Sequence, residues 1–469
     1  MSLLEQPLIT LVQLAQWANG DLVVRAVPHA ADAREALLRS GVTGASLDTR
    51  TLEPGMLFVP LPGAQVDGHA YLDEAFARGA GAALCAREVY PHIEHHDLGP
   101  LVLVNDVTAA LQRLATKLRE LWPGLLLGIT GSAGKTTTKE LVAAAFATAG
   151  PTLRTQGNLN NHWGVPLTLL ALRPEHQVAV VEMGMSNAGE IAALAKIAKP
   201  VAAIVTNAGS AHLQNLGTLE AIAAEKASLV HALGSGQPAF VGADSPRLLE
   251  AVRGAQARVI TYGLAPGADV RPLRVEDLGQ RGSRIEVQDF PPVHLQLIGA
   301  HQVRNALAAI AVAKHYRLDG EAVAAALAAH LPLPGRMEVR TVRGATLLVD
   351  CYNANPDATQ AALGTLARWP GARRRIAVLG DMLELGATAP QLHRETGALV
   401  QGAELWAVGA YANDYAEGAR AARVNARVFA DKPSLAAQLA AELAPGTVVL
   451  LKGSRGAALE DVLADLREN

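Results

Sequence analysis

The stretch Leu125–Glu140 reads LLLGITGSAGKTTTKE, and it decides what fold we expect for the centre of the chain. An apolar run gives way to a glycine-rich loop, and an Ala- and Leu-rich segment continues to Ala149. A strand, a glycine loop and a helix in this order form a phosphate-binding loop. Residues without a Cβ let the backbone wrap an anion at the positive end of the helix. We therefore predict that a nucleoside triphosphate binds here.

The side chains of this loop suggest two separate tasks. Lys135 would bring a positive charge to the outer phosphates, and the Thr136 hydroxyl would coordinate Mg²⁺. The spacing departs from the common pattern, because Ile129 stands where the first glycine is usually found. A glycine-rich turn with an incidental lysine is the alternative, but the flanking strand and helix patterns favour phosphate binding. The residues predicted to hold the nucleotide are Gly131, Ser132, Ala133, Gly134, Lys135, Thr136 and Thr137.

The composition excludes several classes of partner. The 469 residues suggest about three domains, and 50% of them are apolar. The 41 basic and 44 acidic residues nearly balance, which argues against nucleic acid and anionic membranes as partners. The run Arg373–Arg375 is interpreted as solvated residues that lead into a strand. Two cysteines far apart and no basic N-terminal region before an apolar run predict a cytoplasmic protein, which we expect to be monomeric.

Turn signals divide the chain into three predicted domains, 1–122, 123–333 and 334–469. Trp122-Pro123-Gly124 marks the first boundary, and Leu331–Gly335, with two prolines and a glycine, marks the second. Strand and helix patterns alternate after each boundary, which predicts an α/β fold with a mostly parallel central sheet and a doubly wound, Rossmann-like C-terminal domain. The predicted central strands are 125–129, 178–182, 202–206, 239–241 and 259–262, and a small antiparallel sheet is expected within 265–297.

Polar residues follow two of the central strands. Glu182 ends one apolar run, and Thr206-Asn207 with His212 follows the next. Ligands gather at the carboxyl ends of parallel strands, and a carboxylate beside a histidine suits a second cation. The alternative for Glu182 alone is a residue that merely ends its strand. Lys226, taken alone, is typical of a solvated helix lysine.

Further polar groups occur in turn-prone segments. Asn158, Asn160 and Asn161 could bind an amide- or sugar-rich ligand, although turns use asparagine equally. Arg336 follows the second boundary, where it could reach a γ-phosphate. Three loops that follow C-terminal strands should line one edge, and each by itself could equally be solvated. They are Asp350–Asn355, Gly380–Glu384 and Lys452–Arg455.

Together these motifs resemble the Mur ligases, ATP-dependent amide-forming enzymes of peptidoglycan precursor synthesis. The motifs are TGSAGKTT, VEMG, TN followed by HL, GAHQVRNA, PGRME and DCYNANP. TQGNLNN, VLGDMLELG and LKGSR further resemble the ligases that join D-alanyl-D-alanine to UDP-N-acetylmuramoyl-tripeptide. DTR at 48–50, with PG and LFV after it, is similar to the UDP-binding domain of that group. Gly209-Ser210 departs from the commonest family form.

The resemblance implies a role for each matching residue. Lys135, Lys226, His212 and Arg336 would be catalytic, and Lys226 would carry a carbamate. Two Mg²⁺ ions would be held by Thr136, Glu182, His212 and Lys226. ATP would also contact Asn305, Arg336 and Asp350. The substrates would contact Asp48, Thr49, Arg50, Asn158, Asn161, Asp381 and Lys452.

Two kinds of rival remain open at this point. One rival is the related ligase that adds the third residue of the peptide, although the DNPR signature associated with diaminopimelate addition is missing. Another is a folylpolyglutamate synthase, which adds glutamate to a folate. A P-loop switch or transport ATPase would hydrolyse ATP without an acceptor amine. Phosphate release that depends on the acceptor separates the ligases from that class. Both diaminopimelate and lysine are compatible with the sequence as the third residue of the tripeptide.

Overall fold

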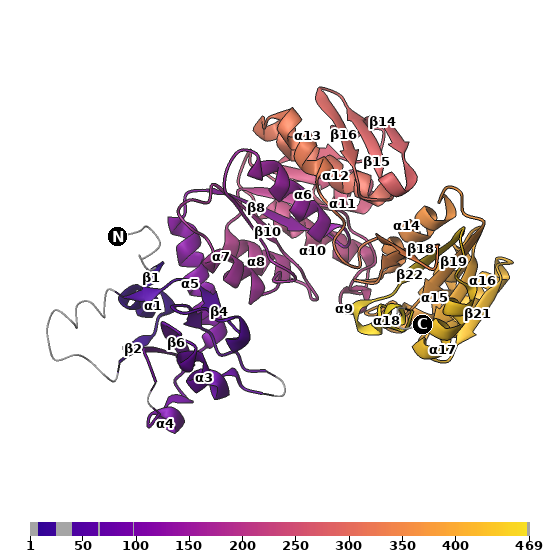
Figure 1. Ribbon diagram of the computed structural model, residues 1–469. Helices are drawn as coiled ribbons and strands as arrows, with labels where there is room; N and C mark the ends of the chain where they lie inside the picture. The colour runs from indigo at the N-terminus through magenta and orange to yellow at the C-terminus, as the bar shows by residue number, and fades with distance from the viewer. Residues whose placement is uncertain (1–7, 25–39, 64–65, 97, 467–469) are drawn as a thin grey trace. The chain divides into compact units, whose positions relative to one another are not determined.

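The computed structural model describes residues 8–24, 40–63, 66–96 and 98–466. The chain forms two compact units. The first consists of Met1–Gly128, Gly150–Gly184 and Ala192–Val201, and the second of Ile129–Ala149, Met185–Ile191 and Ala202–Asn469. Strands and helices alternate through most of both units, so the predicted α/β class is confirmed (Figure 1).

The N-terminal segment contains a five-stranded sheet in the order β2-β7-β6-β5-β4. Strands β4 to β7 pair in parallel, and β2 pairs antiparallel with β7. The strands are β2 Asp21–Val23, β4 Ala45–Ser46, β5 Leu57–Phe58, β6 Ala82–Ala86 and β7 Leu101–Val104. A separate pair joins β1 Ile9–Thr10 to β3 Gly41–Val42. The helices are α1 Leu11–Ala18, α3 Leu72–Ala77, α4 Tyr90–Ile93 and α5 Val107–Leu121.

The central sheet has six strands in the order β13-β12-β11-β8-β10-β9. The pairs β9–β10, β11–β12 and β12–β13 are parallel, as predicted. The strands are β8 Leu125–Thr130, β9 Thr152–Arg154, β10 Val178–Glu182, β11 Ala202–Val205, β12 Pro238–Gly242 and β13 Arg258–Tyr262. The chain leaves β8 for strands on either side of it, so the end of β8 is a topological switch point, where ligands of open α/β sheets bind.

Helices and a small sheet complete this segment. The helices are α6 Lys135–Ala147, α7 Gly164–Leu170, α8 Glu190–Ala198, α9 Leu213–Leu216, α10 Leu219–His231, α11 Pro246–Ala251, α12 Ala300–Tyr316 and α13 Gly320–Ala328. Helix α12 packs against both α6 and β12. The antiparallel sheet predicted within 265–297 is confirmed as β14 Pro272–Asp277, β15 Ser283–Val287 and β16 Phe290–Leu295.

The C-terminal sheet has the order β17-β18-β22-β19-β20-β21. All its pairs are parallel except that of β17 with β18. The strands are β17 Glu338–Val342, β18 Ala345–Asp350, β19 Arg374–Leu379, β20 Glu404–Val408, β21 Ala426–Phe429 and β22 Thr447–Lys452. The helices are α14 Pro356–Ala367, α15 Ala389–Ala398, α16 Ala412–Ala421, α17 Lys432–Glu442 and α18 Asp461–Asp465.

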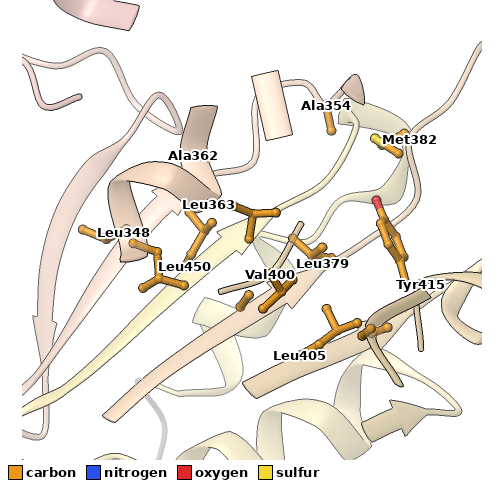
Figure 2. Packing of buried hydrophobic residues seen from close by; sticks show 14 of the residues in the cluster. Leu348, Ala354, Ala362, Leu363, Leu379, Met382, Val400, Leu405, Tyr415 and Leu450 are labelled. Atoms are coloured by element: carbon orange, nitrogen blue, oxygen red, sulfur yellow. The ribbon is translucent and has the colours of Figure 1, made fainter. Parts of the chain in front are cut away.

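Alternate residues of each C-terminal strand supply the two faces of the sheet. Leu348, Leu379 and Leu450 face the cluster that includes α14, α15 and α16 (Figure 2). Their neighbours, such as Leu347 and Leu451, enter a second cluster with α17 and α18. Successive side chains of a strand point to opposite faces. Continuous apolar runs therefore produce a sheet covered on both sides, and the doubly wound prediction is confirmed.

The structure corrects one expectation about charged residues. Arg374 and Arg375 are half-buried and not solvated. Arg374 pairs with Glu404 and Glu442, and Arg375 donates to the carbonyl oxygens of Leu366 and Trp369. Acceptors supplied by neighbouring elements keep both guanidinium groups satisfied away from bulk water. Among the described residues, no helix is long and apolar enough to cross a membrane.

Candidate active site

The glycine loop between β8 and α6 has the backbone geometry that its sequence predicts. Gly134 precedes α6 with φ 80°, and Gly131 has φ 148°. A Cβ on Gly131 would lie 1.8 Å from Thr206 Oγ1, and one on Gly134 would lie 2.4 Å from Asn305 Oδ1. Only glycine fits both positions. The first turn of α6 consequently presents its free N–H groups at the end of the loop, as an anion site requires.

Thr206 and Asn207, which directly follow β11, brace this loop. Asn207 Oδ1 accepts from the N–H groups of Ser132 and Ala133 at 3.1 and 2.9 Å. Thr206 Oγ1 and Asn207 Nδ2 both donate to the carbonyl of Ala133, at 2.6 and 3.1 Å. The sequence placed these two residues near the site but gave them no task. Their polar type at the end of a strand next to β8 was the available signal.

Lys135 and Asn305 lie on either side of the loop. Lys135 Nζ donates to the Gly131 carbonyl at 2.6 Å, so the ammonium lies over the loop. Asn305 is buried in α12, where its Oδ1 accepts from Thr138 Oγ1 at 3.2 Å and its Nδ2 donates to Gln302. Asn305 therefore supports the first turns of α6 from behind. Its predicted contact with ATP stays a prediction.

Lys226 is fully buried in α10, so the interpretation as a solvated lysine is wrong. Its Nζ has no hydrogen-bond partner among the described residues. Burial, and the positive charge of Lys135 after it, lower the pKa of Lys226 far below its usual value. The neighbouring Glu225 is engaged elsewhere, because its carboxylate accepts from the N–H groups of Gly189 and Ile191 at the start of α8. Lys226 is thus a buried lysine whose surroundings disfavour the charged ammonium form.

Glu182 ends β10 and is held by the asparagine-rich motif. Its side chain is 2% exposed, and Asn160 Nδ2 donates to its Oε1 at 2.9 Å. The Glu182 N–H donates to Thr155 Oγ1 at 2.9 Å. Asn161 Oδ1 accepts from the N–H groups of Trp163 and Gly164 just before and at the start of α7, and Asn158 is exposed. Asn160, which the sequence suggested only as a possible ligand contact, is therefore the asparagine that orients this carboxylate.

His212 forms an ion pair with Glu384, with Nδ1 and Oε2 2.6 Å apart. Both residues have left-handed backbones, with φ 64° and 63°. The pairing lowers the pKa of the Glu384 carboxyl. The Gln214 N–H also donates to the Glu384 carbonyl. Two segments far apart in sequence, the start of α9 and the loop after β19, therefore meet at this histidine.

Arg336 reaches the phosphate loop, as its position after the glycine at 335 suggested. Its Nη2 donates to Thr136 Oγ1 at 3.0 Å. The guanidinium carbon lies 3.9 Å from the centre of the Tyr352 ring, which is within the range of a cation–π contact. The structure thereby brings together Arg336 and Thr136, two of the residues predicted to serve ATP.

Asp350 and Lys452 form a buried ion pair at the ends of the paired strands β18 and β22. Lys452 Nζ lies 2.7 Å from Asp350 Oδ2 and also donates to the Asn353 carbonyl at 2.9 Å. Lys452 is 2% exposed, and Asp350 Oδ1 also accepts from the Met337 N–H. These bonds tie the strand ends together. The roles predicted for Lys452 with the substrate and for Asp350 with ATP stay predictions.

The loop after β19 is fixed by several hydrogen bonds. The Asp381 carboxylate accepts from the N–H groups of Ala410 and Tyr411, at 2.9 and 3.0 Å. His393, which is buried, accepts from the Met382 N–H through Nε2 and donates through Nδ1 to the Ala389 carbonyl. Asp381 is therefore engaged with the backbone, and its predicted contact with the substrate stays a prediction.

A cavity of about 330 Å³ opens beside the second domain boundary. Gly335, Arg340, Tyr352, Arg455 and Glu460 contribute to its wall. The Arg455 side chain is 73% exposed and pairs with Glu460 at 2.8 Å. Arg455 is thus an accessible cation at the strand edge where the sequence placed a substrate site, in contrast to Lys452.

The predicted UDP-contacting residues lie together before β5. Asp48 accepts from Arg50 Nη2 at 2.6 Å, and this bond lowers the pKa of the Asp48 carboxyl to about 2. Thr49 is buried, whereas Arg50 is exposed. Thr49 and Arg50 belong to a short 3₁₀ turn, Thr49–Thr51, and Asp48 caps it. Their contact with a substrate stays a prediction.

The donor types at the predicted metal positions suit Mg²⁺. Thr136 and Glu182 offer a hydroxyl and a carboxylate, and Mg²⁺ takes one or two protein oxygens together with phosphates and water. The described residues contain no cluster of three or more His, Cys, Asp or Glu that could hold an ion alone. The unmodified Lys226 amine offers no oxygen, but a carbamate on it would.

Comparison with known proteins assigns all three parts of the chain. Residues 41–119 match the Mur ligase family catalytic domain, 129–313 the Mur ligase middle domain and 335–455 the Mur ligase glutamate ligase domain. UDP-N-acetylmuramoyl-tripeptide–D-alanyl-D-alanine ligase of Synechocystis sp. is 38% identical over 426 residues, which are 89% of this chain and 90% of the relative.

Solved structures agree with this assignment. MurF from Acinetobacter baumannii superposes with a TM-score of 0.85 at 29% identity, over 98% of this chain and 99% of that one. MurF from Thermotoga maritima in complex with ADP gives a TM-score of 0.79 at 29% identity, over 91% and 97%. The chain therefore belongs to the Mur ligase family, in the MurF group of UDP-N-acetylmuramoyl-tripeptide–D-alanyl-D-alanine ligases.

Proposed function

We propose that this chain joins D-alanyl-D-alanine to UDP-N-acetylmuramoyl-tripeptide with ATP, giving the pentapeptide precursor of peptidoglycan, ADP and phosphate. The observation that carries the proposal is the 38% identity over about nine tenths of both chains to a ligase of that name. The braced phosphate loop and the contact between Arg336 and Thr136 support the use of ATP.

The reaction must activate a carboxylate before an amine can attack it. ATP phosphorylates the terminal carboxylate of the tripeptide, and the acyl phosphate and ADP are formed. The acceptor amine attacks the acyl carbon, loses a proton and displaces phosphate. Charge on the transferred phosphoryl group is met by Lys135 and Arg336. Mg²⁺, when bound, supplies further positive charge to the phosphate oxygens.

Other residues would place the substrates and ions. Asp48, Thr49 and Arg50 would contact the UDP group, and Asn158 and Asn161 the rest of the donor. Thr136, Glu182, His212 and a carbamate on Lys226 would hold two Mg²⁺ ions, and Asn305 and Asp350 would contact ATP. The domains would be 1–122, 123–333 and 334–469. The enzyme would act as a monomer in the cytoplasm, where its two buried, free cysteines stay reduced.

The acceptor carboxylate would be bound by Arg455. The sequence allowed either Lys452 or Arg455, but the Lys452 ammonium already contacts three oxygens of Asp350 and Asn353. For the acceptor ammonium, Asp381 is engaged with two backbone N–H groups, whereas the Glu384 side chain is 58% exposed. A dipeptide with charged ends therefore suits Arg455 and Glu384 better than Lys452 and Asp381.

The test is a panel of acceptors. The enzyme is given ATP, UDP-N-acetylmuramoyl-tripeptide and, separately, D-alanyl-D-alanine, D-alanine, L-lysine or diaminopimelate. We expect phosphate release and a product of the pentapeptide mass only with the dipeptide. Better turnover with a single amino acid would refute the choice of acceptor, and phosphate release that ignores the acceptor would refute the ligase reaction itself.

A further inference from the structure

Asp357, in the first turn of α14, contacts the loop that follows β11. Its Oδ2 accepts from the Ser210 N–H at 2.8 Å and from Ser210 Oγ at 2.9 Å. Asn355 caps the same helix, so the Asp357 carboxylate is not needed as the cap. An anion in the first turn of a helix is favoured by the helix dipole. Asp357 thus forms a directed contact with Ser210, 147 residues away along the chain.

The loop that Asp357 holds is itself bonded to the phosphate loop. Ser132 Oγ donates to the Gly209 carbonyl at 3.0 Å and accepts from the Gly209 N–H at 2.9 Å. Ser132 and Ser210 are both buried. A continuous series of hydrogen bonds therefore leads from α14 through residues 209 and 210 to the first half of the phosphate loop.

The contact between Asp357 and residue 209 is close. A Cβ on Gly209 would lie 2.2 Å from Asp357 Oδ2. Glycine at 209 is what lets the carboxylate approach the backbone closely enough to accept from residue 210. The other end of the phosphate loop is contacted by Arg336 through Thr136. Residues C-terminal to 334 thus contact the phosphate loop directly at Thr136 and, through one intervening loop, at Ser132.

We propose that Asp357 is a positioning residue for ATP, because it holds residues 209–210 and through them the Ser132 side of the phosphate loop. The proposal rests on the proposed use of ATP and does not depend on the acceptor. Asp357 touches neither ATP nor the reacting atoms. Without it, the N–H and the hydroxyl of the buried Ser210 both lose their shared acceptor, Gly209 is no longer fixed, and the loop samples geometries that bind phosphates less well.

The test compares ATP binding by variants of the full chain. Asp357→Ala removes the acceptor, Asp357→Asn retains an oxygen of the same shape without charge, and Ser210→Ala removes one of the two donors. Gln360→Ala is the matched control, since Gln360 is an exposed residue of the same helix. Binding is measured by calorimetry with a non-hydrolysable ATP analogue, and the KM values for ATP and for the acceptor are measured separately.

We expect Asp357→Ala to weaken analogue binding and raise the KM for ATP about tenfold, as loss of a charge-assisted hydrogen bond implies. Asp357→Asn should restore most of the affinity, and the KM for the acceptor should stay within about twofold of the original. The double variant with Ser210→Ala should bind ATP no more weakly than Asp357→Ala alone, because both changes break one contact.

Two outcomes would overturn the proposal. One is wild-type ATP affinity in Asp357→Ala, and the other is an equal loss of affinity in Gln360→Ala. Thermal unfolding of each variant shows whether it is folded. If Asp357→Ala does not fold, Asp357→Asn and Ser210→Ala provide the test: a graded loss of ATP affinity in these two variants supports the proposal, and unchanged affinity in both refutes it. No binding of the analogue by the unaltered protein would instead refute the proposed function.

Discussion

A carbamate on Lys226 would explain why this amine is buried without a hydrogen-bond partner in the described part of the chain. An isolated ammonium is costly to bury, so the group is held neutral. A neutral amine can add CO2 and release a proton, which gives a carbamate with two oxygens and a negative charge. The positive charge of Lys135, which lowers the pKa of Lys226, would stabilise that anion. The same environment thus disfavours an ammonium and favours a carbamate.

We expect this carbamate to form in bicarbonate buffer. With ¹³C-labelled bicarbonate, the protein should show one slowly exchanging carbamate carbon signal by NMR, and Lys226→Ala should lack it. Lys226→Ala should also lose most ligase activity and regain part of it when a short carboxylic acid is added. The exposed Lys117 provides the control, since Lys117→Ala should keep both the signal and the activity. A fully active Lys226→Ala without the acid would contradict this.

The lowered pKa of Lys226 also predicts how stability varies with pH in buffer free of CO2. Between the lowered pKa and the usual value of 10.5, the unfolded chain binds a proton that the folded chain does not. The free energy of unfolding should therefore rise with pH across this range, by up to about 1.4 kcal/mol per pH unit. Lys226→Met should flatten that rise and be more stable at neutral pH. Urea unfolding at a series of pH values measures the free energy of unfolding of both proteins. If that free energy varied with pH in the same way in the unaltered protein and in Lys226→Met, the prediction would be refuted.

Gly131 is a second residue whose identity the geometry dictates. Gly131→Ala would place a methyl group 1.8 Å from Thr206 Oγ1 in a backbone with φ 148°. We expect at least a hundredfold loss of ATP affinity, about 2.7 kcal/mol, because the loop must move away from Thr206. Gly267→Ala is the control, since nothing lies near its Cβ position. Calorimetry with ATP measures both, and unchanged affinity in Gly131→Ala would show that the loop is not the site.

The sequence predicted the location of some site residues but not the partners or the burial of others. Lys135, Thr136 and Arg336 could be placed because glycines and a domain boundary mark their surroundings. Asn160 and Asp357 act through partners more than 20 residues away, Glu182 and Ser210, so no local pattern reveals their partners. The burial of Lys226 was equally invisible, because AAEKAS is an ordinary helix sequence whose environment depends on tertiary packing.

At the level of elements, two cations near the ends of β18 and β22 have different roles. Lys452 is buried and structural, whereas Arg455 is accessible. Lys452→Met would leave Asp350 partly buried without its partner, at a cost of about 3–5 kcal/mol of stability. Arg455→Ala should change stability by less than about 0.5 kcal/mol, because its ion pair is exposed. Arg455→Ala should instead raise the KM for D-alanyl-D-alanine about tenfold.

Urea unfolding and steady-state kinetics on the two variants separate these effects. Arg253→Ala serves as a control from another exposed ion pair, with Glu250, and should leave the acceptor KM unchanged. An acceptor KM that rises in Lys452→Met alone, with stability intact, would reverse the assignment and restore Lys452 as the acceptor cation.

The sequence predicted the buried strands and the edge strand β13, but it missed several other edge strands. Strands such as β10 and β22 are buried at every position, and their apolar runs are unambiguous. The edge strands β9, β17 and β21 were not predicted. They are short and half-buried, with charged residues such as Arg340 and Arg427, so neither an apolar run nor a strict alternation marks them.

For the whole molecule, the order of the motifs along the chain predicted the family fold without any contact information. Each nucleotide or substrate motif follows a strand, and the carboxyl ends of parallel strands are where ligands bind. Apart from the contact of Arg336 with the phosphate loop, the interactions that join residues before 331 to those after 335 could not be predicted. They depend on which loops meet in space, as His212 with Glu384 and Ser210 with Asp357 do.

The segment Leu331–Gly335 predicts a motion that these interactions would control. Leu331 is exposed, and Gly335 has φ 67°, a backbone that favours glycine. Arg336, Asp357 and Glu384 make polar contacts with the earlier part of the chain, and these contacts would form in a docked state and break in a released one. A ligand that binds only the docked state shifts such a balance towards it.

We therefore expect ATP and UDP-N-acetylmuramoyl-tripeptide together to reduce the radius of gyration measured by solution X-ray scattering, with a smaller change for either ligand alone. Arg336→Ala should weaken this compaction, because it removes the contact with Thr136. Arg394→Ala is a suitable control, since Arg394 pairs with Asp414 within the C-terminal part of the chain and should respond to the ligands as the unaltered protein does. Equal radii with and without saturating ligands would show that residues 331–335 do not act as a closing hinge.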